Sequence, residues 1–252
     1  MVEQKQLSAY LHDLLQVDMF SDFCPNGLQV QGKNGIDKII TGVTACRALL
    51  EVAVQKKADA VLVHHGYFWK NDEPTITGIQ YHRLRLLLQH DINLFAYHLP
   101  LDAHATYGNN VALAKLLNIA IQDDMNLPYG TGVGLIGKLP TPVHAIDFAR
   151  VIARKLGREP LVVSPNQQKI SRIAWCTGGA QSEIIRAAEC GVDAYLTGEC
   201  SEQTFHLARE LGVHFFAAGH HATERYGVQC LGEHLADKFD IDCEFIDIDN
   251  PM

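Results

Sequence analysis

Short apolar runs alternate with helical patterns along most of the chain. The β-branched run KIITGVTA (38–45) predicts a strand, the segment 46–57 has the apolar spacing of a helix, and ADAVLVHH (58–65) predicts a second strand. The other expected strands are 93–98, 172–177, 193–198, 213–219 and 242–248, and the other expected helices are 79–90, 181–190, 202–211 and 222–238. Such alternation predicts an α/β fold with largely parallel, mixed sheets flanked by helices.

The second half of the chain repeats the pattern of the first. Residues 38–66 align with 172–200 at a constant shift of 134, and the strand–helix–strand pattern matches without a gap. The next strands align at a shift of 122, which pairs His98 with His220 and Asp102 with Glu224. Sequence identity is low, so two units that share only a generic β–α rhythm remain an alternative.

The segment 120–142 separates the two halves. It is rich in glycine, proline and acidic residues, which predicts a loop that contains a short strand. The sequence therefore predicts two similar, interlinked α/β lobes, residues 1–125 and 126–252.

The composition narrows the class of protein. Of the 252 residues, 47% are hydrophobic and 20% are charged, as in soluble globular proteins. The formal net charge of −8 argues against a nucleic-acid-binding surface, which needs a basic face. The seven cysteines are odd in number and form no C-x-x-C pair, which predicts reduced thiols in a cytoplasmic protein. No apolar run approaches the ~20 residues that span a bilayer, so no membrane partner is expected.

Two adjacent histidines end an apolar strand in VLVHHG (61–66). Ligands collect at the carboxyl ends of strands in open α/β sheets, and neutral imidazole binds Zn, Fe and Mn ions. Neighbouring side chains of an extended strand point to opposite sides, so His64 and His65 are placed to hold one ion each of a pair. A polar strand terminus without a ligand is the alternative.

Two further groups follow apolar strands. In YHLPLDAH (97–104), Asp102 offers a carboxylate that could bridge two cations, and Pro100 predicts an extended segment. In GHHATE (219–224), either His220 or His221 can share a helical face with Glu224. Taken alone, the last motif fits an ordinary helix start with an acid in its first turn better than a metal site.

Together the three groups supply the imidazoles and carboxylates of a dinuclear site with ions roughly 3.5–4 Å apart. The run GVGLIG (132–137) formally fits a dinucleotide-binding pattern, but KLPTP follows it where a helix would have to begin. We therefore expect no dinucleotide site there.

Five separated motifs also share their order and spacing with a known family. They are DFCPNGLQVQG (22–32), VLVHHG (61–66), YHLPLDAH (97–104), YLTGE (195–199) and GHHATE (219–224). In these motifs the chain resembles the NIF-three-like family from about residue 5 to the C-terminus. Some members carry an inserted middle domain. This chain is too short to hold one, and the segment 120–142 is where it would stand.

The resemblance implies a toroidal homohexamer with a dinuclear metal site between the two lobes of each subunit. By motif, the ligands would be His64, His65, Asp102, His220 and Glu224, with His98 beside the metals. We expect His98 to act there as general acid/base, because an imidazole has an unperturbed pKa near the working pH. His221 would be a bystander, because the family pattern fixes the first histidine of its pair. The two divalent ions would be Zn, Fe, Mn or Ni.

The family's GTP cyclohydrolase type label implies hydrolytic opening of a purine ring. We therefore expect a metal-dependent hydrolase of a nucleotide-like substrate. The alternative is a metal-handling or partner-binding scaffold protein that catalyses nothing.

Overall fold

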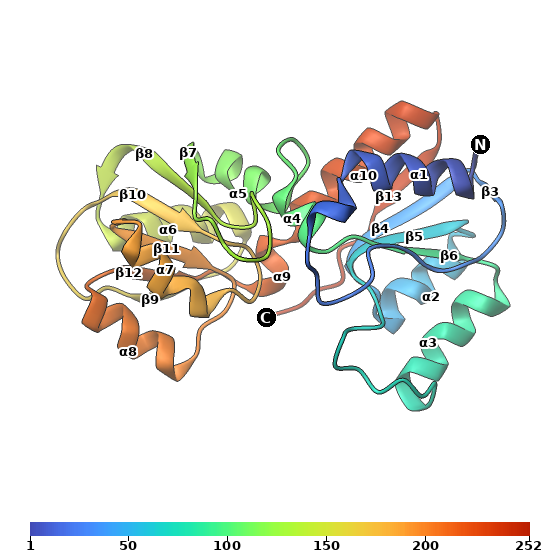
Figure 1. Cartoon of the computed structure of the whole chain (residues 1–252), viewed down its shortest axis with the longest axis horizontal. Coiled ribbons are helices and arrows are strands. Elements are labelled where there is room, and N and C mark those ends of the chain that lie inside the picture. The colour runs from blue at the N-terminus through green and yellow to red at the C-terminus, as the bar shows by residue number, and fades with distance from the viewer. The chain divides into compact units, whose positions relative to one another are not determined.

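The computed structural model describes residues 1–252, and the chain divides into two compact units. Unit 1 comprises Met1–Leu101 and Gly227–Asp249, and unit 2 comprises Asp102–Tyr226 and Asn250–Met252. This division differs from the expected single break after residue 125 because the chain leaves unit 1 earlier and later returns to it. Figure 1 labels the elements along the chain.

Unit 1 is built on a five-stranded sheet in the order β13-β4-β5-β6-β2. Three of its four pairings are parallel, and only β2 runs antiparallel, to β6. The strands are β2 (Gly27–Val30), β4 (Lys38–Thr44), β5 (Ala60–His65), β6 (Asn93–Ala96) and β13 (Asp242–Phe245). The remaining elements are β1 (Val2–Glu3) paired with β3 (Gly35–Ile36), the 3-10 helix η1 (Val17–Met19), and the helices α1 (Gln4–Leu14), α2 (Arg47–Gln55), α3 (Gly78–Gln89) and most of α10 (Arg225–Phe239).

Alternating strand residues give this sheet two apolar faces. Figure 1 shows α1 and α10 on one face and α2 and α3 on the other. Ile39 and Leu62 pack in a buried cluster with side chains of α1 and α10, whereas Ile40 and Val61 pack with α2 and α3. The strands of unit 1 are therefore covered on both sides, which explains their continuous apolar runs.

Unit 2 has a six-stranded sheet in the order β7-β8-β10-β11-β12-β9. The pairings β10–β11 and β11–β12 are parallel, and the other three are antiparallel. The strands are β7 (Ala120–Asp124), β8 (Leu135–Val143), β9 (Leu161–Val163), β10 (Ile170–Trp175), β11 (Ala194–Thr197) and β12 (His214–Ala217). The helices are α5 (Asn109–Leu117), α6 (Ala145–Leu156), η2 (Gln181–Glu183), α7 (Ile184–Glu189), α8 (Glu202–Leu211) and α9 (His220–Thr223). Two mixed sheets flanked by helices confirm the expected fold class, although the expectation of largely parallel sheets holds only for unit 1.

Trp175 lies at the centre of the unit 2 core. It is fully buried at the end of β10 and packs in one cluster with Phe148 of α6, Leu113 of α5 and Phe216 of β12. Its indole Nε1 donates a hydrogen bond to the backbone oxygen of Asn110, 3.0 Å away. The large ring is thereby fixed in one orientation, because a buried indole N–H needs an acceptor.

The two units share the same strand pairing, which supports the internal repeat. Ala60 pairs with Ile39 as Ala194 pairs with Ile173, at the expected shift of 134. The aspartate before each of these strands also acts alike: the Oδ2 of Asp59 accepts from the backbone N–H of residues 37 and 38, and the Oδ2 of Asp193 accepts from residues 171 and 172. Each carboxylate therefore holds the first residues of the neighbouring strand in place, β4 in unit 1 and β10 in unit 2.

The expected alignment of the next strand is wrong by one residue. Asn93 of β6 occupies the position of His214 of β12, which is a shift of 121 rather than 122. His98 therefore falls opposite Gly219 and one position before His220. The low identity between the halves explains the error, because only the strand pairing fixes such a register.

Replacing Asp59 by Asn is expected to lower the free energy of unfolding by roughly 1–3 kcal/mol at pH 7. Burial raises the pKa of Asp59, but the ion pair with Lys33 and the two backbone N–H groups lower it below its usual value. A lowered pKa in the folded state stabilises the protein above the unfolded-state pKa near 4, and this stability is lost as the pH falls below it. The difference between wild type and variant should therefore shrink in urea titrations below about pH 4. Asp13→Asn, an exposed position of α1, is the control, and an equal loss there would contradict the assignment.

Two local expectations are wrong. The segment after β6 is not extended, because α4 (Leu99–Ala103) forms there with Pro100 in its first turn, where a missing N–H costs no hydrogen bond. The segment 120–142 is not mainly loop, because β7 and β8 occupy most of it. Pro140 and Pro142 lie in β8 between the paired positions Lys138 and Val143, so they interrupt no cross-strand bond.

All seven cysteines are free thiols, as expected from their number and spacing. Burial, aided by the nearby Asp22 carboxylate, raises the pKa of the Cys24 thiol to about 12. Burial likewise raises the pKa of the Cys200 thiol. A protonated thiol is a poor nucleophile, so these cysteines offer no nucleophilic centre. The helices of the structure include none with the length and apolar character of a membrane span.

Candidate metal centre

Three histidines of unit 1 come together at the carboxyl ends of two neighbouring parallel strands. His64 and His65 end β5, and His98 follows β6. Their ligand atoms lie within 4.8 Å of one another, and the ring centroids of His64 lie 4.6 Å from His65 and 5.1 Å from His98. The expectation that His64 and His65 point to opposite sides is therefore wrong, because the two rings lie side by side.

Hydrogen bonds fix which nitrogen each imidazole can offer to a cation. The Nδ1 of buried His64 lies 3.0 Å from the backbone oxygen of Tyr97, which can only accept. The Nδ1 of His98 lies 2.7 Å from the Asp22 carboxylate. Both Nδ1 atoms therefore donate, and in the neutral imidazole the lone pair lies on Nε2. Such partners orient metal-binding histidines in proteins generally. The Nδ1 of His65 bonds to Thr44 Oγ1 at 3.1 Å.

Asp22 is a functional residue that the sequence analysis missed. Its Oδ1 accepts from His98 and from the backbone N–H of Phe23, and its Oδ2 accepts from Asn26 and from the backbone N–H of Leu99. Burial raises the pKa of Asp22, but these donors together lower it below its ordinary value. The carboxylate is therefore ionised near neutral pH and holds His98 in one tautomer. Asp22 opens the quoted motif DFCPNG, which was the available signal.

Unit 2 brings two buried carboxylates and one histidine together. Asp102 of α4 is 5% exposed and Glu224 after α9 is 2% exposed, and their oxygens lie within 4.8 Å of each other. The Nε2 of His220 lies 3.1 Å from Glu224 Oε2. His220, rather than its neighbour His221, is thus the histidine that converges with Glu224. Burying two carboxylates side by side is costly unless positive charge compensates them, which is what a divalent cation would supply.

Glu199 orients His220 as Asp22 orients His98, by accepting a hydrogen bond from Nδ1. The Nδ1 of His220 donates to Glu199 Oε1 over 2.7 Å, which leaves Nε2 directed at Glu224. Burial lowers the pKa of His220, but Glu224 and Glu199 outweigh burial and raise it to about 9. Negative charge is thus concentrated around this imidazole. Glu199 ends the quoted motif YLTGE, yet nothing in its spacing revealed the contact.

A dense set of hydrogen bonds positions Asp102. Its Oδ1 accepts from Asn109 Nδ2 at 2.9 Å and from Thr177 Oγ1 at 3.1 Å. Fully buried Asn110 accepts from the backbone N–H of Thr177 and donates to the backbone oxygens of Asp102 and Val133. The loop after β10 and the start of α5 therefore fix the aspartate from two sides.

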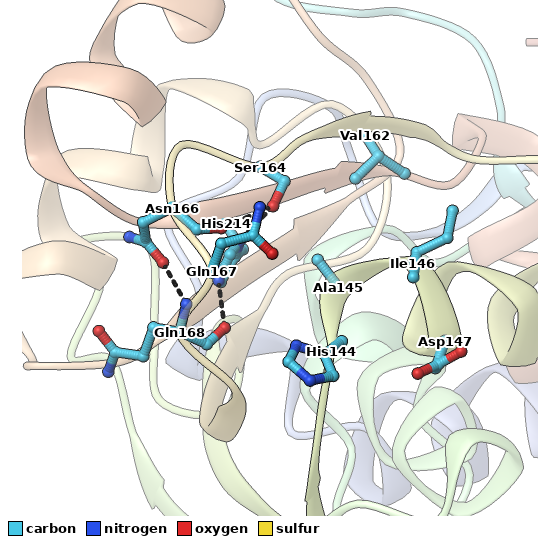
Figure 2. A pocket seen from close by; sticks show the side chains of 10 residues that line it. All are labelled: His144, Ala145, Ile146, Asp147, Val162, Ser164, Asn166, Gln167, Gln168 and His214. Atoms are coloured by element: carbon cyan, nitrogen blue, oxygen red, sulfur yellow. Dashed lines mark hydrogen bonds between the residues drawn. The ribbon is translucent and has the colours of Figure 1, made fainter.

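Another histidine in unit 2 lies beside a pocket but has a structural role. The pocket of about 420 Å³ is lined by His144, Asp147, Ser164 and His214 among others (Figure 2). Buried His214 bonds through Nδ1 to Ser164 and through Nε2 to the backbone oxygen of Gln168. Asn93, its counterpart in unit 1, likewise bonds to the loop that follows the antiparallel edge strand. His214 therefore fastens a loop, and the Ser164–His214 pair needs no catalytic explanation.

Comparisons with known proteins identify the family of the chain. The model of the family described as Duf34/NIF3 (NGG1p interacting factor 3) matches residues 2–251. The chain belongs to this family. The match confirms the NIF-three-like resemblance that the five motifs suggested.

Relatives and a solved structure cover this NIF3-family chain almost completely. A Yersinia pestis protein is 51% identical over 98% of both chains, and a Pseudomonas aeruginosa protein is 54% identical over 94% of both; each is named GTP cyclohydrolase 1 type 2 homolog. A solved structure described as protein ybgI of unknown function matches all of both chains with a TM-score of 0.96 and 49% identity. The fold of this NIF3-family member is thereby established independently.

Proposed function

We propose that this protein is a dinuclear metal-dependent hydrolase of a nucleotide-like substrate. One observation carries the proposal: Asp102 and Glu224 are buried carboxylates within 4.8 Å of each other. A buried acidic pair of this kind is suited to divalent cations. His64, whose Nδ1 is occupied by a backbone carbonyl, supplies the complementary kind of donor.

Five side chains would hold the two ions: His64, His65, Asp102, His220 and Glu224. Imidazole and carboxylate donors together suit Zn, Fe, Mn or Ni. Asp102 is the first residue of unit 2, and Glu224 lies shortly before the chain returns to unit 1, so both carboxylates stand next to the connections between the units. When bound, such a pair of ions activates water and polarises the group under attack.

His98 would move the proton during hydrolysis. Its Nδ1 is committed to Asp22, so Nε2 is the atom that can accept a proton and later return it. Asp22 would stabilise the imidazolium and keep the ring in place, as the carboxylate of a histidine–carboxylate pair does in other hydrolases. The name shared by the curated relatives, GTP cyclohydrolase 1 type 2 homolog, supports a purine nucleotide as the substrate.

The proposal predicts metal-dependent turnover of GTP or a related nucleotide. We expect protein purified with its metals to contain up to two divalent ions per chain by elemental analysis. We expect His64→Ala to lose most of the metal, and His98→Gln to keep the metal but lose at least about 100-fold in kcat. Product formation from GTP, GMP and guanosine measures both effects. Turnover equal to that of His64→Ala would refute the hydrolase and favour the metal-handling or scaffold role.

We also propose that the chain assembles as a toroidal homohexamer. Several apolar side chains on and beside α3 are exposed, which is typical of surfaces that bind another chain: Ile76, Ile79, Tyr81 and Leu88. Light scattering of the same preparation gives the mass of the assembly, and the mass of a single chain would contradict the proposal.

A further inference from the structure

Two aromatic rings flank the histidines of unit 1. The ring of Trp69 lies 5.0 Å from His98 and nearly perpendicular to it, at 81°, and 6.0 Å from His65. The ring of Phe23 lies 6.5 Å from His98. These aromatic side chains come from separate segments, one before β2 and one after β5. The mechanism described above uses neither of them.

The backbone holds both rings in place. Lys70 donates its backbone N–H to the oxygen of Phe23 at 2.8 Å, which ties the two segments together. The amide side chain of Gln29 bonds to both backbone groups of Tyr67, and the Tyr67 hydroxyl donates to the oxygen of Ala45 at 2.7 Å. The segment that carries Trp69 is therefore anchored on the edge of the sheet, although it has no regular secondary structure.

Both segments keep apolar surface in contact with solvent. Phe23 is 46% exposed, and Phe68 is 37% exposed with a φ of +64°. A left-handed backbone is rare for a bulky residue and costs free energy, which is retained chiefly at functional sites. An ordinary core contact does not explain rings that remain open to solvent beside a cluster of imidazoles.

We propose that Trp69 and Phe23 bind the planar heterocyclic ring of the substrate beside His98. The inference rests on the proposed function and adds to it the two side chains that would recognise the base of the substrate. The π-faces of the two side chains would contact the flat base, and each such stacking contact strengthens binding of a base about 10- to 100-fold. The bound ring would then lie next to His98, whose Nε2 would transfer the proton.

Tryptophan fluorescence tests the inference without requiring turnover. The chain has two tryptophans, and Trp175 is fully buried in unit 2, so a ligand at the proposed site changes mainly the emission of Trp69. We expect guanosine to quench the metal-loaded protein saturably, whereas ribose 5-phosphate should not. Trp69→Phe should abolish the response, and Phe23→Leu should weaken guanosine binding at least about 10-fold. Phe205→Leu, an exposed aromatic position of α8, is the matched control and should bind as wild type does.

The outcomes separate this inference from the hydrolase proposal. Saturable quenching by guanosine without turnover would retain the base-binding site and reject the hydrolase. Turnover with an unchanged KM in both Trp69→Phe and Phe23→Leu would retain the hydrolase and overturn the aromatic site. Equal quenching by ribose 5-phosphate and guanosine would also overturn it.

Discussion

Gly178→Ala is expected to leave the protein folded but to weaken metal binding by at least about 100-fold. This is the upper end of the loss in affinity that usually follows when the groups that position a metal ligand are disturbed. Gly178 has a φ of +70°, and a Cβ atom there would overlap Glu224 Oε1 and lie 2.9 Å from the Glu224 Cδ and 3.1 Å from His220 Nε2. The end of the Glu224 side chain can rotate away, so the fold survives. The carboxylate then leaves the position in which it faces Asp102 and His220. Isothermal titration with Zn²⁺ or Mn²⁺ measures the loss of affinity.

Gly157→Ala separates the clash from the backbone strain. Gly157 ends α6 with a φ of +75°, but nothing lies within 4 Å of its Cβ position. Both variants should lose about 1 kcal/mol of stability from the left-handed backbone, and only Gly178→Ala should lose metal affinity. Wild-type affinity in Gly178→Ala would show that Glu224 is not a ligand.

Asn110→Ala should destabilise unit 2 by roughly 3–5 kcal/mol, because several buried backbone groups lose their partners together. The Asn110 side chain bonds to the backbone of Thr177, Asp102, Gly132 and Val133 and is fully buried, so no water replaces it. Since Asp102 is among these partners, its carboxylate should also lose its fixed position. Urea unfolding followed by the emission of buried Trp175 measures the stability.

Asn166→Ala is the matched comparison in the same unit. The Asn166 side chain also makes two backbone bonds, to Gly212 and Gln168, but it lies in a partly exposed loop where water can replace them. Its loss should cost about 1 kcal/mol or less. Equal destabilisation by the two variants would contradict the importance of burial at Asn110.

The fold followed from the sequence wherever apolar runs were continuous. Strands buried on both faces, such as β5 and β11, leave an uninterrupted apolar run, and their ends identify the edge where ligands collect. His64, His65 and His98 were placed correctly at this edge for that reason. Asp102 and the pair His220 and Glu224 likewise follow apolar strands, as expected, and their role as metal ligands stays a prediction.

The residues that the sequence did not reveal act through long-range contacts. Asp22 meets His98 from 76 positions away, and Thr177 meets Asp102 from 75. No local spacing encodes such a pairing, which the folded sheet alone brings about. The effect of Pro100 was predicted wrongly for a related reason. Proline disfavours a helix interior but suits the first turn of a helix. Which of the two applies depends on where β6 ends, and the local sequence does not specify that position.

Unit 1 is built from two stretches of the chain that are far apart in the sequence, which affects the order in which the protein can fold. Its sheet receives its edge strand β13 and the apolar side chains Val228, Leu231 and Leu235 of α10 from residues 227–249. During synthesis, all of residues 102–226 leave the ribosome before these pieces do. Unit 2 therefore has nearly all of its chain available while unit 1, although translated first, still exposes one face of its sheet. The order of translation and the order of completion are thus opposite for the two units.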